Sequence, residues 1–366
     1  MTKKVAIFLS SFEGGGAHKN MIHISNYLNS SGYNVDLVVV NNKGDLRNLV
    51  SNEVDIVSLG TSRVRYSVSS LLNYIRRSRP DSLLATPTGC TIVAGIVDIL
   101  PIYNIPITLR VPTTLSESRL YNKPNDIVEK QFSKVIEHIY KRSKSIIAIS
   151  EGVKIDLVNE FGIPNNKVKI IHNPVVTDDV IKKIHEPVDH PFFNDSSQIF
   201  IGVGRLTEQK GFKYLIDAFS IVEKEVDAKL IILGQGELDR ELKKRCEELS
   251  ITNKVSFPGF VHNPFKYIHN SDVFVLSSLW EGFGNVVVEA LACKTAVVAT
   301  DCRSGPSEIL ADGEFGRLVP PAAPSKLADG MLESLSHNHD STKLRHRALD
   351  FHVKNIGPEY EQELII

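Results

Sequence analysis

Short apolar runs alternate with amphipathic stretches along the whole 366-residue chain. Between the runs, apolar side chains recur at helical spacing, as they do within residues 128–139. A strand followed by a helix, repeated many times, predicts an α/β fold in which parallel sheets are covered by helices on both faces. The runs predicted as strands in the first half are Val5–Leu9, Val35–Val40, Asp55–Leu59, Ser82–Ala85, Ile107–Arg110, Ser145–Ile149 and Val168–Ile171.

The second half repeats this alternation, and the chain is long enough for a second domain of the same kind. Its predicted strands are Ile199–Val203, Lys229–Leu233, Val255–Phe257, Val273–Leu276, Ala296–Ala299 and Arg317–Val319. Between the halves, a stretch rich in Pro, Asp, Asn and His has the composition of a linker. We therefore expect domains over 1–174 and 198–345, a linker over 175–197, and a helical segment over 346–366 that packs back on the first domain.

Charge is distributed unevenly, although the whole chain has a net charge of −1. Residues 1–174 hold 21 Lys and Arg against 14 Asp and Glu, a net charge of +7, and the remainder carries −8. Opposite charges suggest that the halves face different surroundings. Asp98 and two prolines interrupt the most apolar stretch, 91–109, so we expect no transmembrane helix.

The four cysteines show no metal-ligand spacing and indicate reduced thiols of a cytoplasmic protein. The N-terminal run Val5–Leu9 is too short for a signal peptide. We therefore expect no metal site and no secretion signal.

A glycine-rich turn, Gly14-Gly15-Gly16, follows the first predicted strand within the run Ser10–His18. Glycines leave backbone N–H groups open to an anion, and the positive end of the following helix would add to the attraction. The spacing is not that of the dinucleotide fingerprint, which argues against a dehydrogenase. A flexible turn without a ligand is the alternative interpretation.

Arg205 and Lys210 lie in the run Gly202–Gly211, which follows the first strand of the second half. Such a loop lies at the carboxyl edge of the predicted sheet, where doubly wound folds bind ligands. A guanidinium and an ammonium that converge there suit a diphosphate. Two solvated surface charges are the alternative interpretation.

The most informative motif is the run Trp280–Cys293, directly after an apolar strand. Gly284 and Asn285 predict a helix start whose first three N–H groups can bind a phosphate. Glu281 precedes this start, and Glu289 lies one turn after Asn285 on the same helix face. Carboxylates accept hydrogen bonds from sugar hydroxyls, so we expect one at a hexose and one at a ribose. In the alternative, Glu281 is a helix cap and Glu289 is solvated.

Together these motifs resemble glycosyltransferase family 4, retaining enzymes of the GT-B fold. The resemblance spans nearly the whole chain and is more specific in the second half. It is carried by Glu281 and Glu289 with seven residues between them, Gly204-Arg205-Leu206, Lys210-Gly211, Ala148–Ser150, Ile170–Pro174, Gly259–Val261 and Asn263-Pro264. The run Asp301–Leu310 is similar to members that build bacterial surface polysaccharides, including N-acetylgalactosaminyltransferases.

The resemblance implies two Rossmann-like domains with a cleft between them, the first for the acceptor and the second for the nucleotide sugar. It implies that Arg205 and Lys210 are catalytic and hold the donor diphosphate, while Glu281 binds hydroxyls of the donor sugar. The residues implied in donor binding are Gly15, Gly16, Phe260, Val261, Gly282, Phe283, Gly284, Asn285, Val286 and Glu289. Many members carry a histidine near the sugar in the region that here reads Thr108–Thr114 without one. Arg110 and His18 are therefore the residues expected near the sugar or the acceptor.

The implied reaction moves a hexose or N-acetylhexosamine, with retention, from a nucleotide sugar, expected to be UDP-linked, to a glycan or polyprenyl-diphosphate-linked saccharide. It needs no metal and no cofactor, because Arg205, Lys210 and helix N-termini would stabilise the leaving diphosphate. With no carboxylate placed as a nucleophile, we favour front-side attack by the acceptor hydroxyl. A sugar-nucleotide 2-epimerase and a non-catalytic nucleotide-sugar-binding protein are the alternatives, and no nucleic acid is expected as a partner.

A basic segment over 63–79 combines five arginines with apolar residues at helical spacing. Such a helix could rest on the anionic inner face of the cytoplasmic membrane, and a lipid-linked acceptor would favour that location. An ordinary sheet-covering helix with solvated arginines is the alternative.

Overall fold

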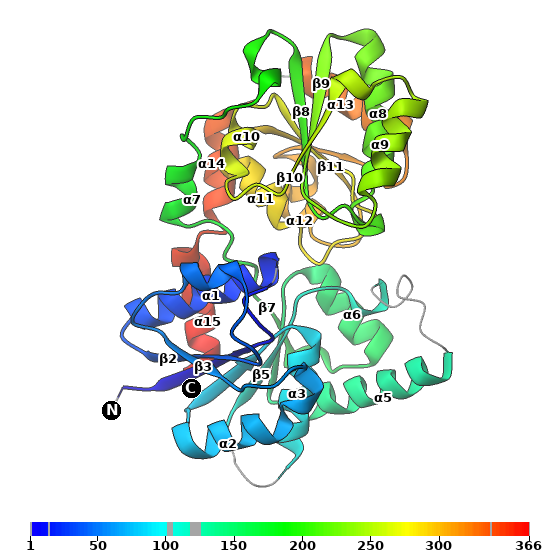
Figure 1. Cartoon of the computed structure of the whole chain (residues 1–366). Helices are drawn as coiled ribbons and strands as arrows, with labels where there is room; N and C mark the ends of the chain where they lie inside the picture. The colour runs from blue at the N-terminus through cyan, green and yellow to red at the C-terminus, as the bar shows by residue number, and fades with distance from the viewer. Residues whose placement is uncertain (1, 14, 101–104, 118–125, 337–338, 366) are drawn as a thin grey trace. The chain divides into compact units, whose positions relative to one another are not determined.

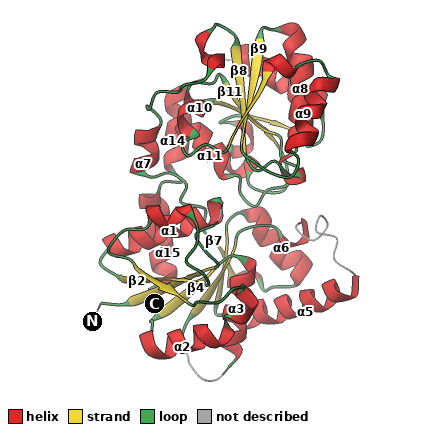
Figure 2. Ribbon diagram, in the orientation of Figure 1, coloured by secondary structure: helices red, strands yellow, loops and turns green. Residues whose placement is uncertain are grey.

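The computed structural model describes residues 2–13, 15–100, 105–117, 126–336 and 339–365. The chain forms two compact units. Unit 1 comprises Met1–Pro174 and Val353–Ile366, and unit 2 comprises Val175–His352. Within each unit, a sheet lies between layers of helices (Figures 1 and 2).

Unit 1 is built on a seven-stranded parallel sheet with the order β3-β2-β1-β4-β5-β6-β7. The strands are β1 (Lys4–Leu9), β2 (Asn34–Val39), β3 (Asp55–Ser58), β4 (Ser82–Ala85), β5 (Ile107–Val111), β6 (Ser145–Ala148) and β7 (Val168–Ile170). Each confirms a strand predicted from an apolar run. The order reverses between β1 and β4, so the carboxyl ends of these strands form the switch point where α/β sheets bind ligands.

Helices cover both faces of this sheet, which explains why its central strands are continuous apolar runs. They are α1 (Gly16–Ser30), α2 (Val68–Ser78), α3 (Thr88–Ile99), α5 (Asp126–Arg142), α6 (Glu151–Phe161) and α15 (Val353–Leu364). Figure 1 shows α1 and α15 on one face and α2, α3 and α5 on the other. The last helix, α15, belongs to this unit because Ile356, Tyr360 and Leu364 are buried in the core with β1 and α1.

Unit 2 contains a six-stranded parallel sheet with the order β10-β9-β8-β11-β12-β13. Its strands are β8 (Gln198–Val203), β9 (Ala228–Leu233), β10 (Val255–Gly259), β11 (Val273–Leu276), β12 (Ala296–Thr300) and β13 (Arg317–Val319). Its helices are α7 (Asp178–Lys183), α8 (Phe212–Glu225), α9 (Asp239–Glu248), α10 (Phe265–His269), α11 (Asn285–Ala292), α12 (Pro306–Ile309), α13 (Pro324–Ser336) and α14 (Ser341–Leu349). Helices α8, α9 and α13 lie on one face, and α7, α10, α11 and α14 on the other (Figure 1).

The segment 175–197 has the composition of a linker but is part of unit 2. Thr177 caps α7, and its hydroxyl accepts a hydrogen bond from the Val180 backbone at 3.3 Å. Val180 and Ile184 are buried, so two apolar side chains hold this polar segment on the unit. The segment 346–366 is likewise divided, because α14 ends in unit 2 while α15 lies in unit 1.

Three apolar residues of the basic segment pack into the protein, whereas Tyr66 is exposed. Leu71, Tyr74 and Ile75 of α2 are buried, whereas Arg76 and Arg77 are exposed. Helix α2 therefore covers the sheet with its apolar stripe and presents its arginines to solvent. Within the described ranges, every helix is too short or too polar to cross a bilayer.

Candidate functional site

The loop between β8 and α8 is anchored by its own backbone. Leu206 is fully buried, and its N–H donates to the Gln235 carbonyl at 2.9 Å. At the end of the loop, Gly211 has φ +59°, and a Cβ there would lie 2.2 Å from the Ser277 carbonyl oxygen. Only glycine allows this close approach, which brings Lys210 to the carboxyl end of β11.

Lys210 and Glu281 form an ion pair at this edge of the sheet, with 2.5 Å between Nζ and Oε1. Their side chains are 14% and 8% exposed. The Ser278 hydroxyl donates to the same Oε1 at 2.7 Å, while Oε2 receives no hydrogen bond from any described residue. The Glu281 backbone is fixed to the following loop by hydrogen bonds with Arg303 and Ser304, both of 3.1 Å. One carboxylate oxygen is thus held by the protein, and the other is available to a ligand.

Helix α11 begins where the sequence predicts, with Gly284 as its N-cap at φ +94°. The N–H of Val287 donates to the Gly284 carbonyl at 2.9 Å, so this amide is used within the helix. The expectation of three ligand-binding amides is therefore wrong for Val287. The remaining predicted donor residues of this motif divide by burial: Gly282, Phe283 and Gly284 are buried, whereas Asn285, Val286 and Glu289 are half-buried on α11.

Two further predicted residues lie after neighbouring strands of the same sheet. Arg205 follows β8 and is exposed, and its guanidinium makes no hydrogen bond or ion pair with the described part of the chain. Phe260 follows β10 and is 62% exposed, with Val261 half-buried beside it. Because the strands are parallel, these loops and the loop after β11 share the carboxyl edge. An exposed cation and an exposed aromatic ring are therefore available there.

Cys302 lies close enough to the ion pair for the Glu281 carboxylate to act on it. Burial, followed by this negative charge, raises the pKa of the Cys302 thiol to about 12. The thiol therefore stays protonated at neutral pH and is a poor nucleophile.

In unit 1, Gly15 is exposed and caps α1, and Gly16 is the first residue of that helix. Gly14 lies outside the described residues. His18, in the first turn, has Nε2 2.8 Å from the Ser10 hydroxyl oxygen. Burial lowers the pKa of His18, and the positive charge of Arg110 lowers it further. The imidazole is therefore neutral at pH 7.

Arg110, on β5, is fully buried. Its guanidinium donates from Nε to the Tyr360 hydroxyl at 2.9 Å, from Nη1 to the Thr86 hydroxyl at 3.4 Å, and from Nη2 to the Asn173 amide oxygen at 2.5 Å. These protein groups, rather than solvent, surround the guanidinium. Any contact between this side chain and a saccharide, as the resemblance implies, would require a rearrangement.

Three polar residues that the sequence reasoning missed hold the predicted ones in place: Ser278, Thr86 and Tyr360. Thr86 directly follows an apolar strand, and Ser278 is the second residue after one, so both carry the signal of a polar group at a carboxyl edge. Tyr360 carries no such local signal, because it lies 250 residues from Arg110.

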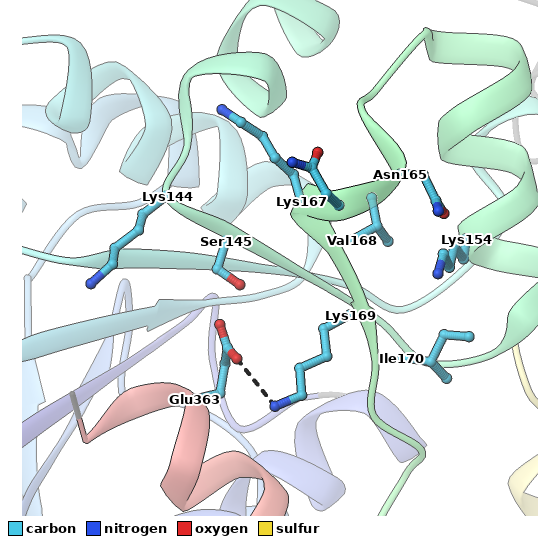
Figure 3. Close-up of a pocket in the computed structure, with 10 residues that line it drawn as sticks. Lys144, Ser145, Lys154, Asn165, Lys167, Val168, Lys169, Ile170 and Glu363 are labelled. Atoms are coloured by element: carbon cyan, nitrogen blue, oxygen red, sulfur yellow. Dashed lines mark ion pairs between the residues drawn. The ribbon is translucent and has the colours of Figure 1, made fainter.

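A separate hollow of about 600 Å³ in unit 1 lies at the start of β6 and β7 (Figure 3). Lys144, Lys154, Lys167 and Lys169 line it, and Lys169 pairs with Glu363 at 3.4 Å. None of the residues predicted for the site lines this hollow. It lies at the amino edge of these strands and is distinct from the loops described above.

Two family models together match most of the chain. Residues 14–179 match "Glycosyltransferase Family 4", and residues 186–350 match "Glycosyl transferases group 1". The chain is 35% identical over 250 residues to an uncharacterized glycosyltransferase of Methanocaldococcus jannaschii, which covers 66% of this chain and 60% of that protein. It is 36% identical over 207 residues to N-acetylgalactosamine-N,N'-diacetylbacillosaminyl-diphospho-undecaprenol 4-alpha-N-acetylgalactosaminyltransferase of Campylobacter jejuni, covering 57% and 54%. The chain thus spans a little over half the length of these two relatives.

Solved structures share the fold over nearly the whole chain. Anabaena Alr3699/HepE in complex with UDP matches with a TM-score of 0.79 and 19% identity, covering 99% of both chains. The lipopolysaccharide outer core galactosyltransferase WaaB matches with a TM-score of 0.76 and 19% identity, covering 99% of this chain and 98% of that one. The predicted fold class and family are therefore confirmed. The chain belongs to the GT-B glycosyltransferases, with a family 4 domain at residues 14–179 and a group 1 domain at residues 186–350.

Proposed function

We propose that this protein is a retaining, metal-independent glycosyltransferase of surface-polysaccharide biosynthesis. It moves a hexose or N-acetylhexosamine from a nucleotide sugar, preferably UDP-linked, to a glycan or polyprenyl-diphosphate-linked saccharide. Two relatives support this proposal by their names: the Campylobacter jejuni N-acetylgalactosaminyltransferase, and a lipopolysaccharide core biosynthesis glycosyltransferase of Rhizobium meliloti, 25% identical over 91% of this chain. The UDP bound to Anabaena HepE supports the choice of carrier.

The observation that carries the proposal is the Lys210–Glu281 pair at the carboxyl edge of unit 2. An ammonium has three N–H donors, and Glu281 takes one of them, so Lys210 retains donors for a phosphate. Glu281 Oε2 can accept a hydrogen bond from a sugar hydroxyl, since Lys210 and Ser278 bind only Oε1. One pair of side chains thus offers contacts to both the diphosphate and the sugar of a donor.

The same ion pair supports direct attack by the acceptor hydroxyl over a covalent intermediate on Glu281. With its charge compensated by Lys210, Glu281 is a weak nucleophile and serves as a binding group. The acceptor hydroxyl then attacks the anomeric carbon as the bond to the diphosphate breaks, and its proton passes to a departing phosphate oxygen. Lys210 and Arg205 stabilise the negative charge that develops on this leaving group. The predicted donor contacts that remain to be tested are Gly15, Gly16, Phe260, Val261, Gly282, Phe283, Gly284, Asn285, Val286 and Glu289.

Calorimetry with a series of nucleoside diphosphates tests donor binding directly. We expect UDP to bind more tightly than GDP or ADP. Products of a reaction with labelled nucleotide sugars and lipid-linked saccharides then distinguish a transferase from an epimerase, which would return an altered sugar nucleotide without an acceptor. Anomeric NMR of the product tests retention, and an EDTA-treated sample tests metal independence. Failure of every nucleoside diphosphate to bind would overturn the proposal.

We extend the proposal to peripheral contact with an anionic membrane through the arginines of α2. Arg76, Arg77 and Arg79 are exposed, and each basic residue near an anionic surface contributes about 1 kcal/mol. Because Leu71, Tyr74 and Ile75 of α2 are buried, the attraction would be mainly electrostatic and would weaken with salt. Flotation with vesicles containing phosphatidylglycerol should recover the protein at low salt, and changing the three arginines to Glu should abolish recovery.

A further inference from the structure

Arg110 is a buried cation without a buried anion. Among the described residues, no carboxylate lies within ion-pair distance of its guanidinium, and the three groups that accept its hydrogen bonds are a phenol, a hydroxyl and an amide. A guanidinium does not lose its proton in proteins. Burial raises the pKa of Tyr360, so this phenol is neutral as well. A full positive charge therefore remains inside unit 1.

An uncompensated charge in a protein interior is costly and acts strongly on neighbouring groups, because little solvent screens it. It disfavours protonation of a neighbouring side chain that would become positively charged.

The hydrogen bonds lead from Arg110 to the carboxyl end of β1. Nη1 of Arg110 contacts Thr86, directly after β4. The Thr86 N–H donates to the Phe8 carbonyl in β1 at 3.1 Å. Two residues later, the Ser10 hydroxyl lies 2.8 Å from Nε2 of His18. The buried guanidinium and the half-buried imidazole thus lie at one sheet edge, on adjoining strands β1, β4 and β5.

We propose that Arg110 is a positioning residue that acts through His18, keeping its imidazole uncharged so that His18 can accept a hydrogen bond from a saccharide hydroxyl. A neutral imidazole has one N–H and one lone pair, whereas the protonated ring can only donate. Ser10 engages Nε2, and Nδ1 has no partner among the described residues. The ring can rearrange its tautomer to donate on one side and accept on the other.

The charged and titratable groups around this imidazole come from several elements. Arg110 on β5 acts on His18, and Tyr360 on α15 accepts a hydrogen bond from Arg110. The titratable residues nearest to His18 in the sequence are Glu13 in the preceding loop, and Lys19 and His23 on α1. His23 is engaged by the Pro174 carbonyl at 3.0 Å, and Glu13 is exposed. Burial is the larger cause of the lowered pKa of His18, and the charge of Arg110 lowers this pKa further. Acidification would protonate His18 and remove its acceptor.

The saccharide nature of the ligand rests on the proposed function, but the state of His18 does not. NMR of the full chain with labelled histidine measures the titration midpoint of His18, assigned by the loss of its signal in His18→Gln. We expect a wild-type midpoint below 6.5, the ordinary value. Arg110→Gln and Arg110→Met remove the charge and should move this midpoint upward. Arg110→Lys keeps the charge and should leave it low, and Arg142→Gln, at an exposed arginine of the same unit, is the control.

The outcomes separate a positioning role from a structural one. If Arg110 only supported the fold, the Lys, Gln and Met variants would disturb His18 alike. A wild-type midpoint at or above 6.5 overturns the proposal without any Arg110 variant, as does an unchanged midpoint in folded Arg110→Gln. In transfer assays, the acid limb of kcat/KM should move to higher pH in Arg110→Gln. If no donor supports transfer while the His18 midpoint behaves as expected, the proposed function fails and the assignment of Arg110 stands.

Discussion

At the carboxyl edges of the two sheets, a largely buried cation is stabilised in two different ways. In unit 2, Lys210 is paired with Glu281 at 2.5 Å, and both belong to loops that follow adjacent strands. In unit 1, Arg110 on β5 is held by three neutral groups, one just after β4, one after β7 and one on α15. The first arrangement suits a ligand that brings its own negative charge and hydroxyls. The second arrangement suits control over the charge of a neighbouring side chain.

The largest effect should come from breaking the pair in unit 2. Lys210→Ala leaves a carboxylate that is 8% exposed without its cation and removes a phosphate contact, so we expect a loss of transfer of about 10²–10³-fold. Glu281→Ala should lose a comparable amount. Initial rates with the preferred donor, together with circular dichroism to verify folding, measure both.

A matched control lies elsewhere in unit 2. Lys254 pairs with Glu223 at 2.9 Å, away from the loops of the site. Lys254→Ala should retain nearly wild-type rates. Equal losses in Lys254→Ala and Lys210→Ala would mean that ion pairing supports the fold in general and would remove Lys210 from the site.

The next largest effect should appear in the stability of alanine variants at two glycines with nearly the same backbone conformation. Gly211 in unit 2 has φ +59° and ψ 26°, and Gly162 in unit 1 has φ +60° and ψ 29°. A Cβ at Gly211 would lie 2.2 Å from the Ser277 oxygen, whereas one at Gly162 would lie 3.5 Å from Lys141. Gly162→Ala should cost about 1–2 kcal/mol of unfolding free energy, and Gly211→Ala about 2–4 kcal/mol. Urea denaturation measures the difference, and equal costs would contradict the close packing of this loop on β11.

A smaller loss of stability is expected when one of the three neutral acceptors around Arg110 in unit 1 is removed. Tyr360→Phe leaves the buried Nε of Arg110 without its acceptor, so we expect a loss of about 1–3 kcal/mol. Tyr27→Phe is the control, because its hydroxyl makes only a 3.4 Å contact with Glu361. Thermal unfolding should place Tyr360→Phe below both Tyr27→Phe and the wild type. A wild-type melting temperature for Tyr360→Phe would show that Arg110 finds another acceptor.

The smallest effect is the pH dependence of stability. The folded state holds the pKa of His18 below that of the unfolded chain, so below about pH 6.5 the unfolded state binds more protons. Stability should therefore be complete above this pH and decline as the pH falls toward the folded pKa. His190 in unit 2 has a pKa lowered by burial, without a buried guanidinium. Urea unfolding of His18→Gln and His190→Gln between pH 5 and 8 should weaken this dependence in both, and more in His18→Gln.

Much of the fold follows from local patterns in the sequence. Every strand overlaps a predicted apolar run, with boundaries that differ by two residues or fewer, because strands buried on both faces must be apolar throughout. The start of α11 was predictable because Gly and Asn are common at the N-terminus of a helix, and Gly284 is its N-cap. Arg205, Lys210 and Glu281 were identified because they stand in loops that directly follow strands.

The interactions between these residues could not be predicted in the same way. The ion pair of Lys210 with Glu281 joins loops 71 residues apart, and it depends on the packing of Gly211 against Ser277. Arg110 meets Asn173, 63 residues later in the chain, and meets Tyr360 only after the chain has passed through all of unit 2. The composition of 175–197 indicated a linker because its few buried residues, such as Val180 and Ile184, are outnumbered by polar ones.

Helix α15 makes the order of synthesis matter for this protein. Its residues Ile356, Tyr360 and Leu364 complete the apolar core around β1 and α1, yet they leave the ribosome after all of unit 2. Unit 2 is made of one contiguous stretch of chain, so its sheet can form as soon as that stretch is synthesised. In unit 1, the apolar surface of β1 and α1 stays exposed until α15 has been synthesised. A chaperone that binds exposed apolar segments would accordingly encounter the earliest-made part of this polypeptide for the longest time.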